Sequence, residues 1–221
     1  MTQPLPIYRD PGFRRLWTVG LLTSLIRWLE ILVFGVFTYQ QTQSAGWVAS
    51  LTMLRMLPMG LFGVLFGSVA ARISRRTGLI VSQSVLLATS LCLLVVSAVG
   101  VLEIWHLAVA SLISGTAWAG DMPMRRGLMG DIAGHQRMGQ AMALDAVANN
   151  GCRLLGPSLG GLLLANGGMT AVFVFAALLY VPVLVAVLTL VDRPVSMTGP
   201  KPSILSMLVG GVLAARDNVQ L

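Results

Sequence analysis

The chain has 221 residues, of which 56% are hydrophobic and only 10% are charged. About a quarter of the residues in a typical soluble domain are charged, so this composition excludes an ordinary soluble fold. The net charge of +7 suits a nucleic-acid-binding protein in principle. The basic residues only flank apolar runs, however, and no basic helix or aromatic-studded strand lies outside them, which argues against nucleic acid as a partner.

Six apolar segments follow one another along the chain, and each predicts a transmembrane helix. They cover residues 17–39, 46–69, 79–101, 104–122, 139–165 and 169–191. A helix rising about 1.5 Å per residue needs about 20 residues to cross a hydrocarbon core of about 30 Å, and all six comply or nearly so. Because the runs are continuously apolar and do not alternate in units of about ten residues, helices are predicted in preference to a membrane barrel.

The positions of the Lys and Arg residues orient these helices. Twelve of the fifteen lie in four short polar stretches: Arg9, Arg14 and Arg15; Arg72, Arg75 and Arg76; Arg125, Arg126 and Arg137; Arg193, Lys201 and Arg216. The alternating stretches, around residues 40–46, 102–106 and 165–168, hold none. Short loops rich in Lys and Arg stay in the cytoplasm, so we expect a multi-pass protein of the inner (plasma) membrane with both chain ends cytoplasmic.

The two ends of the chain differ in character. The first apolar run is too long for a signal-peptide core and lacks a small-residue cleavage site, so it is expected to stay in the mature protein. After Asp192 the chain turns polar and rich in proline, and no seventh span follows. We therefore predict a six-helix bundle over residues 1–195 and the start of a cytoplasmic central loop over 196–221. The chain is interpreted as a truncated part of a longer protein.

Three arginines lie near the midpoints of predicted helices: Arg27, Arg55 and Arg153. A charge at the centre of a bilayer costs about 2.5–3.5 kcal/mol on insertion scales, so each must face a polar partner or a water-filled cavity. Arg27 and Glu30 are three residues apart and can share one face of a helix. They either neutralise each other and only hold the bundle together, or they belong to a transport path.

The fifth predicted helix carries polar residues at a regular spacing. Asp145, Asn149 and Arg153 recur every four residues and predict one polar stripe. Pro157 denies the carbonyl of Arg153 its helical hydrogen bond, because proline has no N–H. A broken helix beside a cationic side chain is typical of transporters that expose backbone polar groups to a cavity.

The fourth predicted helix is expected to end at a cluster of charges. Asp121, Arg125 and Arg126 follow its apolar run and are assigned to the cytoplasmic face. Cations at the C-terminus of a helix are favoured by the helix dipole. A state-dependent salt bridge to the neighbouring loop is the alternative interpretation.

Two motifs carry a resemblance to a known family. After the second apolar segment comes Gly67-Ser-Val-Ala-Ala-Arg72-Ile-Ser-Arg75-Arg76, similar to the cytoplasmic loop pattern G-x-L-A-D-R-x-G-R-R/K. Late in the fifth segment comes Gly156-Pro157-Ser-Leu-Gly160-Gly161, similar to the core of an antiporter motif. With these motifs, and with a tail like a long central loop, the chain resembles the amino-terminal half of a major facilitator superfamily transporter in the siderophore and macrolide exporter branch.

The resemblance implies an all-α membrane protein whose six helices form one half, a three-plus-three inverted repeat, of the superfamily fold. Helices 1, 2, 4 and 5 would then surround a central cavity. The sequence departs from the family pattern at several positions. Ala71 stands where the loop motif has Asp, Ser74 where it has Gly, and Cys152 where the longer antiporter pattern has Gly. Ser111 stands where many proton-coupled members carry Arg.

The spacing of small residues predicts close helix packing. Gly156 and Gly160 are four residues apart, as are Gly63 and Gly67, so each pair lies on one face of its helix. Such faces let neighbouring backbones approach closely. A hinge or gating role is the alternative.

The charges inside the helices suggest how a substrate is handled. We hypothesise that Arg27, Arg55 and Arg153 give the cavity a positive potential that favours anionic or acid-bearing small molecules. Glu30 and Asp145 are the candidate proton carriers. The sequence contains no Gly-rich phosphate loop, no H-E-x-x-H and no paired-Cys motif, so neither an enzyme nor a metal or other cofactor is predicted.

The predicted function is half of a secondary exporter, which moves small organic molecules such as siderophores or drugs by alternating access. Its expected partners are the lipid bilayer, the substrate and a missing carboxy-terminal six-helix half. Three alternatives stay open: an uptake permease for a sugar or organic acid, a truncated membrane protein without transport activity, and a six-helix protein that works as a homodimer.

Overall fold

The computed structural model describes residues 6–70 and 74–190, and within 62–70 it describes the backbone only. The predictions for Arg72 and for the tail 196–221 lie outside the described residues, as do the side-chain surroundings of Gly63 and Gly67. The described elements are all helices: η1 (Ile7–Arg9), α1 (Pro11–Thr42), α2 (Ala45–Ala70), α3 (Arg75–Ala98) and α4 (Ile104–Leu188).

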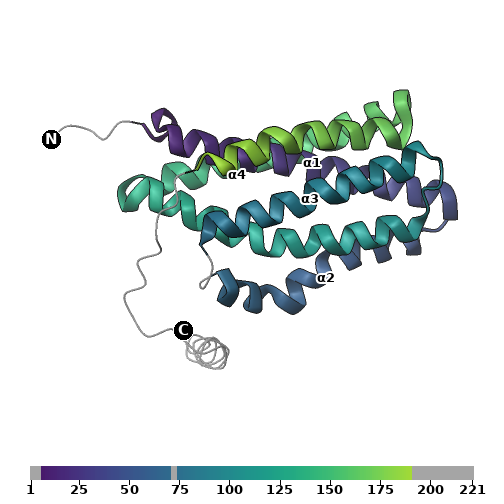
Figure 1. Ribbon diagram of the computed structural model, residues 1–221, viewed down its shortest axis with the longest axis horizontal. Coiled ribbons are helices and arrows are strands. Elements are labelled where there is room, and N and C mark those ends of the chain that lie inside the picture. The colour runs from purple at the N-terminus through teal and green to yellow at the C-terminus, as the bar shows by residue number, and fades with distance from the viewer. Residues whose placement is uncertain (1–5, 71–73, 191–221) are drawn as a thin grey trace.

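The long element α4 changes direction at two glycines. Gly134 and Gly168 both have a φ of 65° with non-helical ψ values, a conformation open in practice only to glycine. They divide α4 into a first stretch (104–133), a second stretch (135–167) and a third stretch (169–188). Figure 1 shows α1, α2, α3 and these stretches running alongside one another in a single elongated bundle. The described residues thus hold six long helical stretches, which overlap the six predicted segments.

Three helices among the described residues are long and apolar enough to cross a membrane: α1, α3 and α4. The 85 residues of α4 would span far more than one bilayer at about 1.5 Å per residue if the helix were unbroken. The chain reverses direction at Gly134 and again at Gly168, so α4 runs along the bundle as three shorter stretches. The total number of crossings stays a prediction.

The first stretch of α4 does not end at residue 122, as predicted, but continues to residue 133. The charges that suggested a helix end, Asp121 and Arg125, are buried inside the bundle and pair there. Neutralised charges need no contact with water, so the helix persists until Gly134 adopts a positive φ. The predicted boundary was wrong for this reason.

The starts of α1 and α3 and two ends within α4 meet at one end of the bundle. Arg15 Nη1 donates to the carbonyl of Thr189 over 3.1 Å, and Arg76 Nη2 donates to that of Leu188 over 2.6 Å. Arg75 forms an ion pair with Asp131, just before the turn at Gly134. Arginines from two of the basic stretches, Arg15 in one and Arg75 and Arg76 in the other, therefore lie at this end.

The opposite end of the bundle holds the turns that contain no Lys or Arg. Ser97 and Thr170, near the turns at Gly100 and Gly168, share a hydrogen bond of 2.9 Å between their hydroxyl groups. The turn between α1 and α2 is made by Gln43, whose φ of 52° is left-handed. The bundle is thus polarised, with one basic end and one end free of basic residues, as the alternation of the loops indicated.

Candidate functional site

The middle of the bundle contains an ion pair between α1 and α2. Arg55 Nη2 lies 2.6 Å from Glu30 Oε2, and each residue is only 5% exposed. Gly115, on the first stretch of α4, lies directly against the backbone carbonyl of Arg55, where a side chain would collide. The Arg55 guanidinium also lies 5.6 Å from the ring centroid of Phe34. The close approach of these helices fixes the arginine at Glu30.

The ion pair of Glu30 is formed with Arg55 and not with Arg27, the partner in one of the two interpretations of the sequence. The Arg27 guanidinium stacks on Trp118 of the first stretch of α4. Arg55 reaches Glu30 from the facing helix α2.

Arg27 lies between this ion pair and a second group of charges. Its guanidinium stacks 4.7 Å from the ring centroid of Trp118. Together with Glu30, Asp121 and Tyr180 it lines a cavity of about 20 Å³, which is room for about one water molecule. Arg27 therefore connects the two charged groups through a small polar space.

The second group of charges joins α3 to two stretches of α4. Arg125, 4% exposed, forms an ion pair with Asp145, and its Nε lies 3.7 Å from Asp121 Oδ2. Gln83 on α3 donates from Nε2 to Asp121 Oδ1 over 2.8 Å. Sequence reasoning had placed Arg125 at a helix end and had not considered Gln83. Gln83 is a single amide within an apolar run, and this pattern could have indicated a buried polar contact.

The predicted stripe of Asp145, Asn149 and Arg153 is divided in the fold. Asp145 is buried, Asn149 is partly buried and Arg153 is exposed. Each four-residue step rotates about 40° around a helix of 3.6 residues per turn, so two steps move Arg153 to another face. Its guanidinium lies 5.1 Å from the ring centroid of Trp28 on α1. Among the described residues it has no carboxylate partner within ion-pair distance.

The charges inside the described part of the bundle balance. Arg55 and Arg125 pair with Glu30, Asp121 and Asp145, and Arg27 lines the small cavity that Glu30 and Asp121 share. The network therefore carries no net charge. This changes the hypothesis of a cavity made positive by three arginines, because of those three only Arg153 lies outside the network.

The antiporter-like motif forms the face that contacts α1. A side-chain carbon on Gly156 would lie 2.7 Å from Trp28 Cβ, and one on Gly160 would lie 3.1 Å from the carbonyl oxygen of Leu29. At Gly161 such a carbon would be 3.8 Å from the Leu32 side chain, an ordinary contact. The four-residue spacing of Gly156 and Gly160 predicted this close packing, and the structure confirms it.

The predicted break of the helix at Pro157 is wrong. Non-helical backbone angles within α4 occur at Gly134 and Gly168, and the helix runs through Pro157. Proline removes one hydrogen bond, but the close packing of Gly156 and Gly160 against α1 holds the segment on both sides. Pro58 likewise lies inside α2.

The described arginines of the loop motif act at the basic end. Arg75 holds Asp131, and Arg76 holds the carbonyl of Leu188, the last residue of α4, as described above. They tie the start of α3 to the ends of the first and third stretches of α4. Of the other members of this motif, Arg72 lies outside the residues that the structure describes, and Gly67 lies where it describes the backbone alone.

Known proteins resemble the chain over most of its length. Residues 2–215 match the family described as transmembrane secretion effector. The chain is 28% identical over 170 residues to YfiS, an uncharacterized MFS-type transporter of Bacillus subtilis, in a match covering 76% of this chain and 40% of that protein. It is 23% identical over 163 residues to the staphyloferrin A transporter of Staphylococcus aureus, covering 73% and 41%.

The matched part of this chain thus spans well under half of each relative. The helical bundle, its apolar surface and the family match over nearly the whole chain agree with one another. The chain belongs to the transmembrane secretion effector family, within the major facilitator superfamily of membrane transporters.

Proposed function

We propose that the chain is the amino-terminal six-helix half of a secondary exporter of small organic molecules, such as siderophores or drugs. In this proposal it crosses the plasma membrane six times with its basic end in the cytoplasm. It rocks against a carboxy-terminal half around a site near the middle of the bilayer. The similarity to the staphyloferrin A transporter supports a siderophore substrate.

The observation that carries the proposal is the buried charge network. Apolar side chains would hold a bundle together as well as buried ion pairs do, or better. Charged residues inside membrane helices commonly mark a substrate or proton path. Here the charges lie on α1, α2 and two stretches of α4, with Gln83 of α3 attached. A network shared by so many helices responds when those helices move.

The two ion pairs are suited to couple protons to helix movement. Glu30 and Asp145 each hold an arginine from another helical stretch. When two such stretches separate, the carboxylate loses its cationic partner and binds a proton more readily. We propose Glu30 and Asp145 as the proton carriers. Arg27, Arg55 and Arg125 are the neighbouring cations whose movement away from these carboxylates allows them to bind a proton.

The exposed side of the second stretch of α4 is the proposed substrate contact. Arg153 is a cation there, and it lies on the indole of Trp28. A cation on an aromatic surface favours a substrate with a carboxylate beside an apolar or aromatic part. Asn149, one turn earlier and partly buried, adds an amide near the same face.

The two sequence motifs complete the proposal. The antiporter-like residues Gly156, Pro157, Gly160 and Gly161 favour export over an uptake permease. The loop residues Gly67, Arg72, Arg75 and Arg76 are proposed to hold the cytoplasmic end closed in one state. The contacts of Arg75 and Arg76 at the basic end support this part.

The test is to express the chain together with the carboxy-terminal half of a full-length relative and measure transport. Inside-out vesicles with an acidic interior should accumulate staphyloferrin A or a macrolide only when both halves are present. Co-purification of the halves controls for assembly. Arg153→Leu should reduce transport of the acidic substrate more than that of the macrolide. A complex that co-purifies but transports neither compound, or only in the opposite direction, would contradict the proposal.

A further inference from the structure

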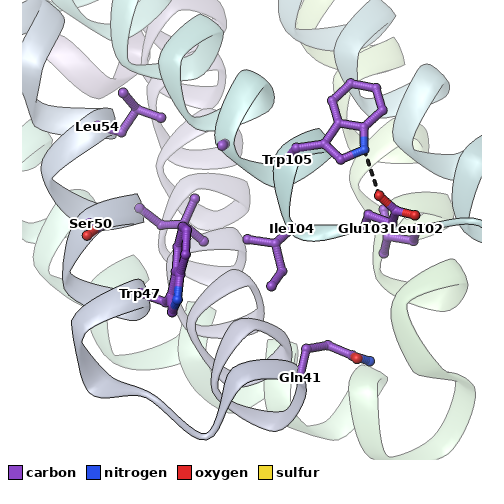
Figure 2. A pocket seen from close by; sticks show the side chains of 10 residues that line it. Gln41, Trp47, Ser50, Leu54, Leu102, Glu103, Ile104 and Trp105 are labelled. Atoms are coloured by element: carbon purple, nitrogen blue, oxygen red, sulfur yellow. Dashed lines mark hydrogen bonds between the residues drawn. The ribbon is translucent and has the colours of Figure 1, made fainter.

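A separate hollow lies at the end of the bundle that has no basic residues. It has a volume of about 650 Å³ and lies between the end of α1, the start of α2 and the start of α4. Pockets for small ligands measure about 300–1,000 Å³. Figure 2 shows Trp47 of α2 across from Ile104, with Glu103 and Trp105 beside it at the start of α4. This hollow shares no residue with the charge network.

The lining combines aromatic rings with one carboxylate. The indoles of Trp47 and Trp105 are 56% and 58% exposed, so both are open to a ligand. Trp105 Nε1 donates to Glu103 Oε2 over 2.9 Å, which orients the carboxylate. Leu51 and Leu54 add an apolar wall. Most of the remaining lining is apolar.

The electrostatics of this end favour a positive ligand. The turns around residues 40–46, 102–106 and 165–168 contain no Lys or Arg, so no basic residue of these turns competes for Glu103. His106 stacks on Trp105 with ring centroids 3.7 Å apart, and its Nδ1 accepts the backbone N–H of Glu103. Glu103 is the one charged residue among those that line the pocket.

We propose that this pocket binds a small organic cation with an ammonium or quaternary ammonium group on an apolar body. The ammonium group lies against the face of Trp47 and the carboxylate of Glu103, as aromatic rings and carboxylates attract such cations. The apolar body lies on the leucines. Tryptophans also anchor helices at a membrane surface, but anchoring alone gives no preference for a cation over a neutral molecule of equal shape.

The pocket can be tested on the purified chain in maltoside micelles, which carry no ammonium headgroups. Radiolabelled benzyltrimethylammonium is bound and then displaced by three competitors. The unlabelled cation should displace it. Neopentylbenzene, which has a carbon in place of the nitrogen, and benzenesulfonate, an anion, should each be weaker by about tenfold or more. Displacement by phosphatidylcholine added to the micelles would identify a lipid headgroup as the source of the cation.

Three variants locate the site. Glu103→Gln keeps an acceptor for Trp105 but removes the charge, and should weaken binding by about tenfold. Trp47→Leu should weaken it by about fivefold. Tyr39→Leu removes an aromatic side chain that is 50% exposed at the same end but outside the pocket, and should change nothing. Circular dichroism checks that each variant is folded. Each of three results would overturn the proposal. The first is that the labelled cation shows no saturable binding. The second is that neopentylbenzene displaces it as well as the unlabelled cation does, and the third is that Glu103→Gln binds it as tightly as the unchanged chain.

Discussion

Arg55 and Glu30 belong to different helices, yet they form a buried ion pair with 2.6 Å between Nη2 and Oε2. Gly115 permits this geometry, because the first stretch of α4 touches the backbone of α2 at Arg55. Three helices therefore meet at one charged contact near the middle of the bundle. Both the stability of the bundle and its proposed movement depend on this contact.

Breaking this pair from one side should be costly, and removing both charges should cost less. Arg55→Met or Glu30→Leu leaves a buried charge without its partner, which costs about 3–5 kcal/mol. The double variant replaces the pair by apolar side chains and should recover most of that loss. Thermal unfolding of the purified chain in detergent measures all three. Additive losses in the double variant would show that the two residues act independently.

The neighbouring arginines Arg125 and Arg126 should behave very differently. Arg125 is buried and paired with Asp145, whereas Arg126 is exposed. Arg125→Ala should therefore destabilise the chain by about 3–5 kcal/mol. Arg126→Ala, an identical change one residue away, should stay within about 0.5 kcal/mol. Equal unfolding temperatures for the two variants would contradict the placement of Arg125 inside the bundle.

The positions of the helices were predictable from the sequence, but the partners of the charges were not. Apolar length and the alternation of basic loops indicated the six long helical stretches and the polarised ends. Periodicity shows which residues share one helix face, such as Arg27 and Glu30. It does not show what the facing helix supplies, and the actual partner, Arg55, lies 25 residues from Glu30 in sequence.

The errors at the fourth and fifth helices have a common origin. From the sequence alone, Asp121 and Arg125 are expected to require contact with water and so to end the fourth helix. Pro157 is likewise expected to break the fifth. In the fold, Asp145 is brought to Arg125 from 20 residues away, and α1 packs on the glycines around Pro157. Tertiary contacts thus removed the reason for each predicted interruption. Gly134, whose positive φ ends the first stretch, was a local signal that could have placed the boundary.

Two glycines on the same helical stretch provide a matched test of the packing against α1. A methyl group on Gly156 would lie 2.7 Å from Trp28 Cβ, whereas one on Gly151 has nothing within 4 Å. Gly156→Ala should destabilise the chain by about 1–3 kcal/mol through overpacking. Gly151→Ala should be neutral or stabilising by up to about 1 kcal/mol, because alanine is the better helix former. Chemical unfolding in mixed micelles compares the two. The reverse order would show that this face does not contact α1.

The orientation of the bundle can be measured by labelling single cysteines. In a background with Cys92 and Cys152 replaced by alanine, Gln43→Cys reports the end free of basic residues. Gln136→Cys, next to the turn at Gly134, reports the basic end. A membrane-impermeant maleimide should label Gln43→Cys in intact cells and Gln136→Cys only after permeabilisation, because basic loops stay inside. Labelling of Gln136→Cys alone in intact cells would mean that the bundle is inverted.

The central claim is that the buried carboxylate of Glu30 takes part in export, and transport by the assembled complex tests it most directly. The chain carrying Glu30→Gln is expressed with the complementary half, and proton-driven accumulation in inside-out vesicles is measured per mole of complex, with Arg126→Ala as control. Because glutamine cannot exchange the proton, accumulation should fall by about tenfold or more, while Arg126→Ala transports normally. Undiminished transport by Glu30→Gln would contradict the account.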